Sequence, residues 1–237
     1  MPTTLVPPTE VSLTRMVSHL RDGELVGMPT ETVYGLAADA ANAAAVAKIY
    51  EVKARPRFNP LIAHVSDLSM AQQEGVLSDR AVDLAKTFWP GPLTLVVNLA
   101  ISATTCDLAR AGLSTIALRC PAHPVARELI EHFGGPLVAP SANLSGGVSP
   151  TRAEHVFSDL SDKIDLILDG GPSQIGLEST IIDARGEHPA LLRSGTITHH
   201  AIERVWPGLI RPATDPDAPT APGQLLRQYA PRARGGR

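Results

Sequence analysis

Two short polar segments carry most of the chemistry in this chain. The first, residues 53–60, places Lys53, Arg55 and Arg57 within five positions, and its two prolines restrict the backbone. A solvated helix end is the plain alternative, because cations favour helix C-termini. The segment leads into an apolar stretch, however, and ligands are usually bound by loops at such places. Since a guanidinium can bind two phosphate oxygens while a lysine acts as a point charge, we expect a clamp for several negative charges.

The second segment, residues 141–147, follows the apolar stretch 137–140 and contains hydroxyls, an amide and paired glycines. Glycines permit positive φ and a close backbone approach, so successive N–H groups can surround an anion. Ser149 and Pro150 are typical of the N-cap and first position of a helix, which we expect to run through Val156. An ordinary Asn/Ser/Gly turn is the alternative for the loop alone, but its position after a buried strand favours a phosphate cradle.

Other polar residues also follow expected strands. Residues 29–36 contain two threonines and a glutamate, which could hold a small polar ligand or form a capped turn. Arg119 ends a strand, where it could bind a carboxylate through two hydrogen bonds. Residues 176–180 and 193–195 repeat the pattern of polar residues at strand ends. The sequence contains neither common nucleotide-binding fingerprint and no serine-hydrolase elbow.

The bulk composition is that of an ordinary globular protein. The chain has 237 residues, of which 43% are hydrophobic and 19% charged. A formal charge of −3 gives no overall attraction to nucleic acid, so any anion must be bound by local clustering. The two cysteines lack metal-ligand spacing and fit a reducing compartment. We find no secretory signal and no membrane-spanning stretch, and therefore expect a cytoplasmic protein without membrane contact.

Apolar periodicity predicts an α/β fold in which helices and strands alternate. The sheet is expected to be mixed and twisted, with helices packed on it. We assign residues 9–206 to one domain and residues 207–237 to a flexible tail, because residues 212–222 are rich in proline and poor in large apolar side chains. The expected helices are 11–20, 43–52, 79–89, 125–133 and 198–205, and the expected strands are 24–28, 61–65, 93–99, 115–119, 137–139, 166–168, 179–182 and 191–193.

Taken in order, these segments resemble the YrdC-like family of threonylcarbamoyl-AMP synthases from about residue 11 to residue 197. Any one motif is weak, but their order and spacing are specific. The matching motifs are Pro29-Thr-Glu-Thr32-Val-Tyr-Gly-Leu36, Lys53-x-Arg55-Pro56 with Asn59-Pro60-Leu61, Trp89-Pro-Gly-Pro92-Leu-Thr94, Thr115-x-x-x-Arg119-x-Pro121, Ala139-Pro-Ser141-Ala-Asn143-x-Ser145-Gly146 and Glu178-Ser179-Thr180-Ile181.

The resemblance implies a YrdC-like fold with a concave, locally basic active-site face. It implies formation of threonylcarbamoyl-AMP and pyrophosphate from L-threonine, bicarbonate and ATP with Mg²⁺, for N6-threonylcarbamoyladenosine in tRNA. It gives catalytic roles around the phosphates to Lys53, Arg55, Ser141 and Asn143. Further ATP contacts are Asn59, Thr115, Ser149, Arg193 and Tyr229, and the threonine contacts are Thr32, His64, Arg119 and Ser179. No protein nucleophile is required, because the carbamate oxygen attacks the α-phosphorus.

Residues 221–231 resemble the linker that folds over the site in larger family members, although Leu226 and Gln228 stand where Tyr and His are usual. The resemblance thus implies the N-terminal domain of the long form plus its linker, a candidate lid, without the second domain. Expected partners are a downstream threonylcarbamoyl-transferase complex and, as a further candidate, tRNA. Two alternatives stay open: carbamoyl-adenylate formation, and a non-catalytic RNA-binding module, against which the net charge and scarce aromatics count.

Overall fold

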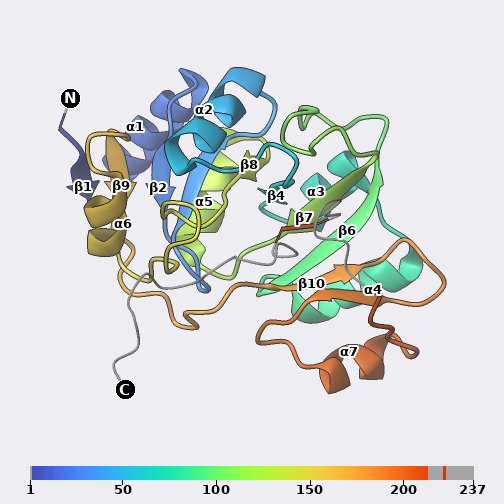
Figure 1. The fold of residues 1–237 in the computed structure, drawn as a ribbon. Helices are drawn as coiled ribbons and strands as arrows, with labels where there is room; N and C mark the ends of the chain where they lie inside the picture. The colour runs from blue at the N-terminus through green and yellow to red at the C-terminus, as the bar shows by residue number, and fades with distance from the viewer. Residues whose placement is uncertain (1, 213–220, 223–237) are drawn as a thin grey trace.

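The computed structural model describes residues 2–212 and 221–222. Helices and strands alternate through these residues, and Figure 1 shows their arrangement. The helices are α1 (Glu10–Arg21), α2 (Ala43–Lys53), α3 (Leu68–Glu74), α4 (Asp79–Phe88), α5 (Pro124–Phe133), α6 (Ala153–Leu160) and α7 (His199–Val205). The strands are β1 (Thr4–Val6), β2 (Val26–Met28), β3 (Gly35–Asp39), β4 (Ile62–His64), β5 (Gly75–Val76), β6 (Leu93–Leu99), β7 (Thr115–Arg119), β8 (Leu137–Val138), β9 (Leu166–Leu168), β10 (Thr180–Asp183) and β11 (Ala190–Arg193).

Within the described residues the strands form one mixed sheet of eleven strands. Their order is β1-β9-β2-β3-β8-β4-β7-β6-β10-β11, and β5 pairs with β6 outside this path. The pairs β1–β9, β2–β9, β4–β7 and β6–β10 are parallel, and the other pairs are antiparallel. The predicted α/β class with a mixed sheet is therefore confirmed.

The two halves of the sheet are covered differently (Figure 1). In the half that contains β2 and β3, both faces carry helices: Leu36 and Ala38 pack with α2 and α6, whereas the intervening Ala37 packs with α1 and α5. In the half that contains β4, β7, β6 and β10, helices α3, α4 and α7 pack on one face. Among the described residues, the opposite face carries a small apolar cluster that includes Ile62 and Ala117, and no helix packs on that cluster. This face is left for the site.

Local sequence explains how the first polar segment is presented. Asn42 caps α2 by accepting hydrogen bonds from the N–H groups of Ala44 (3.0 Å) and Ala45 (3.2 Å). The alanine-rich helix ends at Ala54, which has left-handed backbone angles (φ 50°). Lys53 therefore occupies the last helical position, and residues 55–60 leave the helix in a new direction toward β4.

Most predicted elements are confirmed, and β6, β7 and β9 match residue for residue. We missed β1, β3, α3 and β5. Strand β3 (Gly-Leu-Ala-Ala-Asp) contains no β-branched or aromatic side chain, so its sequence carries no strand signal. It forms because the chain pairs with β2 and β8. The other three elements are seven residues long or shorter, which leaves little periodicity to detect.

The predicted helix start at Ser149 and Pro150 is wrong. Helix α6 begins at Ala153, with Arg152 as its N-cap. The Pro150 carbonyl instead accepts a hydrogen bond from the N–H of Tyr34 (2.8 Å), and the Ser149 hydroxyl donates to Glu178. Tertiary contacts thus use the groups that would have started the helix.

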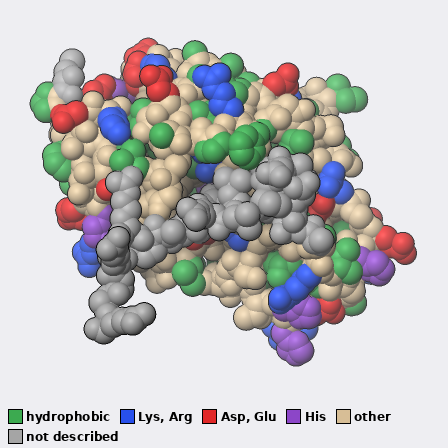
Figure 2. Space-filling view, in the orientation of Figure 1, with side chains coloured by type: hydrophobic (Ala, Val, Ile, Leu, Met, Phe, Trp, Pro, Cys, Tyr) green, Lys and Arg blue, Asp and Glu red, His purple; other side chains and the backbone are tan. Residues whose placement is uncertain are grey.

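The predicted tail 207–237 lies largely outside the described residues, of which it includes only 207–212 and 221–222. In the described part of the chain, no helix has the length and apolar character needed to cross a bilayer. Figure 2 shows Lys and Arg side chains scattered among acidic and neutral ones on the visible face, outside the grey atoms. Outside the grey atoms, the visible face therefore shows no general excess of basic side chains, and the expected basic character has to be sought in the pocket.

Candidate functional site

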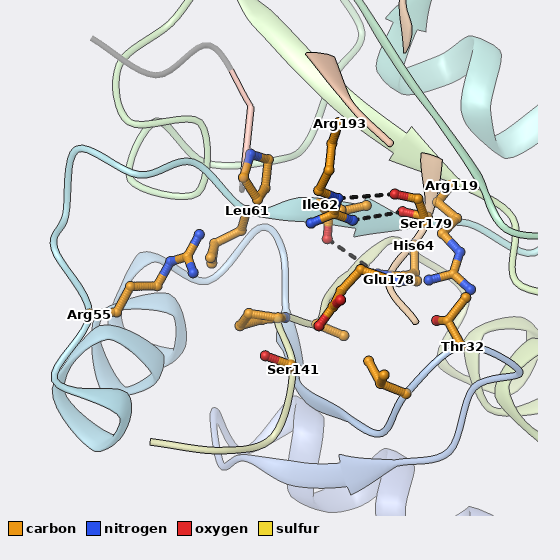
Figure 3. Close-up of a pocket in the computed structure, with 14 residues that line it drawn as sticks. Thr32, Arg55, Leu61, Ile62, His64, Arg119, Ser141, Glu178, Ser179 and Arg193 are labelled. Atoms are coloured by element: carbon orange, nitrogen blue, oxygen red, sulfur yellow. Dashed lines mark hydrogen bonds between the residues drawn. The ribbon is translucent and has the colours of Figure 1, made fainter. Parts of the chain in front are cut away.

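A pocket lies on the helix-free face of the sheet, where β4, β7, β10 and β11 meet the loop that follows β8 (Figure 3). Three arginines and one glutamate are among the described residues that line it, so its local charge is positive. The free space is only about 40 Å³, far below the 300–1,000 Å³ typical of ligand sites. The lining residues are Thr32, Val33, Arg55, Leu61, Ile62, His64, Arg119, Ala139, Pro140, Ser141, Glu178, Ser179, Arg193 and Pro222.

Strand register places His64 and Arg119 side by side, because they are paired residues of the parallel strands β4 and β7. His64 is buried, and its Nδ1 lies 3.2 Å from the Ile62 carbonyl oxygen. Burial and the adjacent Arg119 guanidinium lower the pKa of His64 from 6.5 to about 3. The histidine is therefore a neutral, polar wall of the pocket.

Arg119 is held from behind by Glu31. Its Nη2 donates to Glu31 Oε1 at 2.6 Å, and both side chains are only 5% exposed. Arg119 Nε also donates to the Gly91 carbonyl (3.4 Å), which fixes the plane of the guanidinium. Glu31 Oε2 has no hydrogen-bond partner among the residues that the structure describes. The buried pair orients Arg119 toward the pocket, which Figure 3 shows beside His64 and Thr32.

Ser179 is fixed by a small network at the start of β10. Its hydroxyl lies 2.7 Å from that of Thr94, on the neighbouring strand β6. Arg193 donates through Nη2 to the Ser179 hydroxyl and through Nε to its carbonyl, both at 3.0 Å. Thr32 is likewise held, because its hydroxyl lies 2.9 Å from that of Thr30. The four residues predicted to contact threonine therefore line one pocket in fixed positions.

Glu31 and Thr94 were not among the predicted site residues. Thr94 is a threonine inside a strand and carries no functional signal by itself. Glu31 belongs to residues 29–36, for which a small polar ligand and a capped turn were equally compatible with the sequence. An acid in a segment that is otherwise buried is the one hint, because a buried carboxylate needs a charged partner. For Glu31 that partner is Arg119.

On the other side of the pocket, Lys53 links two segments of the site. Its ammonium group donates to the carbonyl oxygens of Ser141 (2.5 Å) and Asn143, and the N–H of Ser145 donates to the Lys53 carbonyl (3.0 Å). Lys53 is 2% exposed and lies behind the pocket lining. Burial, and secondarily the nearby Arg55, lower its pKa from 10.5 to about 7. The structure thus places Lys53 as a brace beneath the 141–147 loop.

The loop after β8 is also anchored on its other side. The N–H of Leu36 donates to the Pro140 carbonyl (2.7 Å), and the N–H of Ala142 donates to the Tyr34 carbonyl (2.8 Å). This approach requires Gly35, since a Cβ there would lie 2.9 Å from the Cβ of Ala139. The result is a rigid loop that presents Ser141 to the pocket (Figure 3).

Asn143 and Asn59 are buried behind the lining. Asn143 Nδ2 donates to the carbonyls of Leu144 (3.0 Å) and Gly147 (2.8 Å), and so folds the loop. In the described part of the chain, Asn143 Oδ1 and both side-chain polar atoms of Asn59 have no hydrogen-bond partner. Buried polar atoms are rarely left unsatisfied, so these amides fit positions where a bound molecule completes the hydrogen bonding.

Arg55 reaches the pocket while its guanidinium also donates to the Pro60 carbonyl (3.0 Å). Arg57, the third cation of the segment, is exposed and is not among the lining residues. Thr115 is buried at the start of β7, opposite Asn98, and is also outside the lining. Tyr229 lies outside the described residues.

Ser149 connects the pocket to a second, larger cavity. Its hydroxyl donates to Glu178, which lines the first pocket, while Ser149 itself lines a cavity of about 450 Å³. His155 and Asp159 of α6 lie in the same wall. The charged pocket is small, and the second cavity beside it is large enough for a nucleoside.

Residues 221–222 lie against the pocket. Ala221 is fully buried in the apolar cluster with Ile62 and Ala117, and Pro222 is part of the pocket wall. A segment of the predicted tail therefore covers this face of the sheet and accounts in part for the small free volume.

The fold and the site define the class of protein. It is an α/β protein in which strand ends and two loops line a charged pocket. The family model Sua5/YciO/YrdC, described as "Telomere recombination", matches residues 18–195. The chain belongs to this family. It is similar to the threonylcarbamoyl-AMP synthases of Bacillus subtilis (47% identical, covering 90% of this chain and 63% of that protein) and Pyrococcus abyssi (47%, 90% and 64%). It therefore spans somewhat less than two thirds of the length of these curated relatives.

A solved structure is also similar to this chain. The crystal structure of P. abyssi Sua5 complexed with L-threonine superposes with a TM-score of 0.93 and 40% sequence identity. The match covers 98% of this chain and 70% of that one. The similarity includes the strands and loops that build the pocket.

Proposed function

We propose that this chain is a threonylcarbamoyl-AMP synthase, an adenylate-forming enzyme that converts L-threonine, bicarbonate and ATP into threonylcarbamoyl-AMP and pyrophosphate. The observation that carries this proposal is the juxtaposition of Arg119, Thr32, His64 and Ser179 with Arg55 and Ser141 around one pocket. One group can hold an amino acid and the other a phosphate chain. The similarity to a Sua5 protein crystallised with L-threonine supports the same assignment.

In this reaction the residues act by position and charge. Arg119 would bind the threonine carboxylate through its fixed guanidinium. Arg55 and Ser141 would bind phosphate oxygens, with Lys53 and Asn143 holding the loop that presents them. Threonine trapped as a carbamate attacks the α-phosphorus, so orientation and electrostatic stabilisation supply the catalysis. Asn59, Thr115, Ser149, Arg193 and Tyr229 stay predicted ATP contacts.

Mg²⁺ would enter with ATP, where it neutralises charge on the phosphates. Among the described residues no group of three His, Cys, Asp or Glu side chains could hold a metal ion. Glu178 is the one carboxylate in the described pocket lining. This donor set fits an ion carried mainly by phosphate and water oxygens, as Mg²⁺ prefers.

The segment around Ala221 and Pro222 would act as a lid. Both residues cover the pocket face, and about 40 Å³ of free space is too small for a triphosphate beside threonine, so we expect that segment to move. Closure would protect a labile carbamate and mixed anhydride from water. A chain ending at Arg211 should therefore lose activity or release the intermediate early, and unchanged kinetics would contradict the lid.

The product is a reactive adenylate, so a transferase must receive its threonylcarbamoyl group, with tRNA as the final acceptor. A cytoplasmic location without membrane contact follows from the same proposal. The decisive experiment is mass spectrometry of the product formed from ATP, bicarbonate and each of threonine, serine and carbamoyl phosphate. Threonylcarbamoyl-AMP is expected. Carbamoyl phosphate dependence would indicate carbamoyl-adenylate chemistry instead, and RNA binding without turnover would indicate a binding module.

A further inference from the structure

Glu178 is an unexpected residue in a pocket that must accept a nucleoside triphosphate. A carboxylate repels phosphate oxygens, and yet the Glu178 side chain lies among the pocket residues between Ser141 and Thr32 (Figure 3). The groups assigned to phosphate lie on one side of it and those assigned to threonine on the other. A carboxylate in this place can bind a cationic group of a substrate.

The side chain is held firmly in this position. The Ser149 hydroxyl donates to Glu178 Oε1. The backbone of residues 178–180 packs tightly against Gly195, where an added Cβ would lie 2.6 Å from the Glu178 carbonyl oxygen. The next residue, Ser179, is fixed by Thr94 and Arg193. Glu178 is therefore part of the preorganised site rather than a loosely placed surface acid.

Resting on the proposed function, we propose that Glu178 binds the amino group of threonine and accepts the proton that this group must lose. The ammonium form has no lone pair and cannot attack carbon. One N–H bond breaks and one O–H bond forms on the Glu178 carboxyl group. The free amine then attacks the carbon of bicarbonate, forming the N–C bond of the carbamate and releasing water. Each atom and charge is accounted for without a further reactant.

Charge excludes the other candidates in the described lining. Arg55, Arg119 and Arg193 face the pocket from three different segments and repel an ammonium group. His64 cannot serve, because burial and Arg119 keep its pKa near 3. Glu31 is already paired with Arg119 and lies outside the lining. Because the amino and carboxylate groups of threonine share one carbon, a carboxylate on Arg119 brings the amine to the centre of this small pocket, where Glu178 lies.

The test is a comparison of two ligands on two proteins. Glu178→Gln keeps the size of the side chain and an acceptor for Ser149, so the fold should survive; an unchanged melting temperature checks this. Calorimetric titration then measures binding of L-threonine and of 2,3-dihydroxybutanoate, in which a hydroxyl replaces the amine. We expect the substitution to weaken threonine binding about tenfold or more and to leave the analogue unaffected. Equal effects on both ligands, or none on either, would overturn the proposal.

Kinetics supply a second measurement. Threonine-dependent pyrophosphate formation by Glu178→Gln should be reduced at neutral pH and should rise steeply with pH as solution deprotonates the amine, while the wild type depends less on pH. Glu178→Asp should recover part of the activity. Glu128→Gln, the same change on an exposed residue of α5, should match the wild type.

Three further outcomes separate the possibilities. A higher Mg²⁺ requirement of Glu178→Gln with unchanged threonine affinity would identify a metal ligand and overturn the amine assignment. A wild-type protein that binds threonine but forms no pyrophosphate would contradict the proposed function. A wild type that turns threonine over while Glu178→Gln behaves identically would contradict only the role of Glu178.

Discussion

The two sides of the pocket are built in different ways. On the threonine side, His64 and Arg119 project directly from neighbouring strands, and a buried partner, Glu31, orients the arginine. On the phosphate side, Lys53 and Asn143 donate hydrogen bonds to the protein's own carbonyl groups. Strand pairing fixes the positions of side chains through the register of the strands. A loop holds its side chains in place only if further hydrogen bonds stabilise its backbone. Substitutions on the two sides should therefore separate loss of substrate binding from loss of loop structure.

The largest effect is expected from Arg119→Ala. It would remove the carboxylate partner and leave the Glu31 charge buried without its ion pair, at a cost of about 3–5 kcal/mol in the free energy of unfolding. Threonine-dependent kcat/KM should fall on the order of 10²–10³-fold. Chemical denaturation and pyrophosphate release measure the two effects. Arg80→Ala, on the exposed surface of α4, is the matched control. Retained activity would remove Arg119 from the threonine site.

Lys53→Met tests the brace. The substitution keeps much of the side-chain length but leaves two buried loop carbonyls without their donor, which should cost about 1–3 kcal/mol of stability per unsatisfied group. Activity should fall together with the melting temperature. Because the pKa of Lys53 is lowered to about 7 in the folded state, the unfolded state binds more protons between pH 7 and 10.5. Wild-type stability should thus rise relative to the variant across this range. A variant that loses activity at full stability would instead favour direct phosphate contact.

Arg55→Ala should affect ATP binding more than stability, in contrast to Lys53→Met. Its guanidinium reaches the pocket, so the KM for ATP should rise about tenfold or more, while the melting temperature falls less than in Lys53→Met. Steady-state kinetics with varied ATP and a thermal melt of both variants decide the point. Equal losses of stability in the two variants would show that both cations serve the fold.

The pH dependence of His64 gives an effect that is confined to acid pH and is absent at neutral pH. Because the pKa of His64 is lowered from 6.5 to about 3, His64 binds a proton in the unfolded state but not in the folded state between these two pH values. The resulting stability is present above pH 6.5 and is lost as the pH falls toward 3, at up to about 1.4 kcal/mol per pH unit. His64→Gln should flatten this part of the wild-type curve in urea denaturation. Parallel curves for the two proteins would contradict the assignment.

Arg57→Ala should have the smallest effect. The side chain is exposed and is not among the residues that line the pocket, so stability should change by less than about 0.5 kcal/mol. Turnover at saturating ATP should be nearly normal. An activity loss as large as that of Arg55→Ala would place Arg57 on the nucleotide and extend the phosphate side.

Sequence patterns predicted the strands of the threonine side well, because β6 and β7 are long and rich in β-branched residues. They also singled out polar segments whose residues the structure brings together around one pocket. They failed at β3 and at the start of α6, where pairing partners decide the structure. The family resemblance grouped Lys53 with Ser141, but no pattern indicated that the lysine would bond to the carbonyl group of a residue 88 positions away.

The sequence by itself determined the α/β class, the two polar segments and the family, since these depend on periodicity and on residue types at fixed spacing. Only the tertiary structure decided what each polar residue does. It paired Arg119 with Glu31, buried Lys53 beneath the loop, and turned Glu178 into the pocket. The reason is physical: a charged side chain takes its role from the groups that surround it after folding, and burial decides whether it contacts a ligand or satisfies the protein's own backbone.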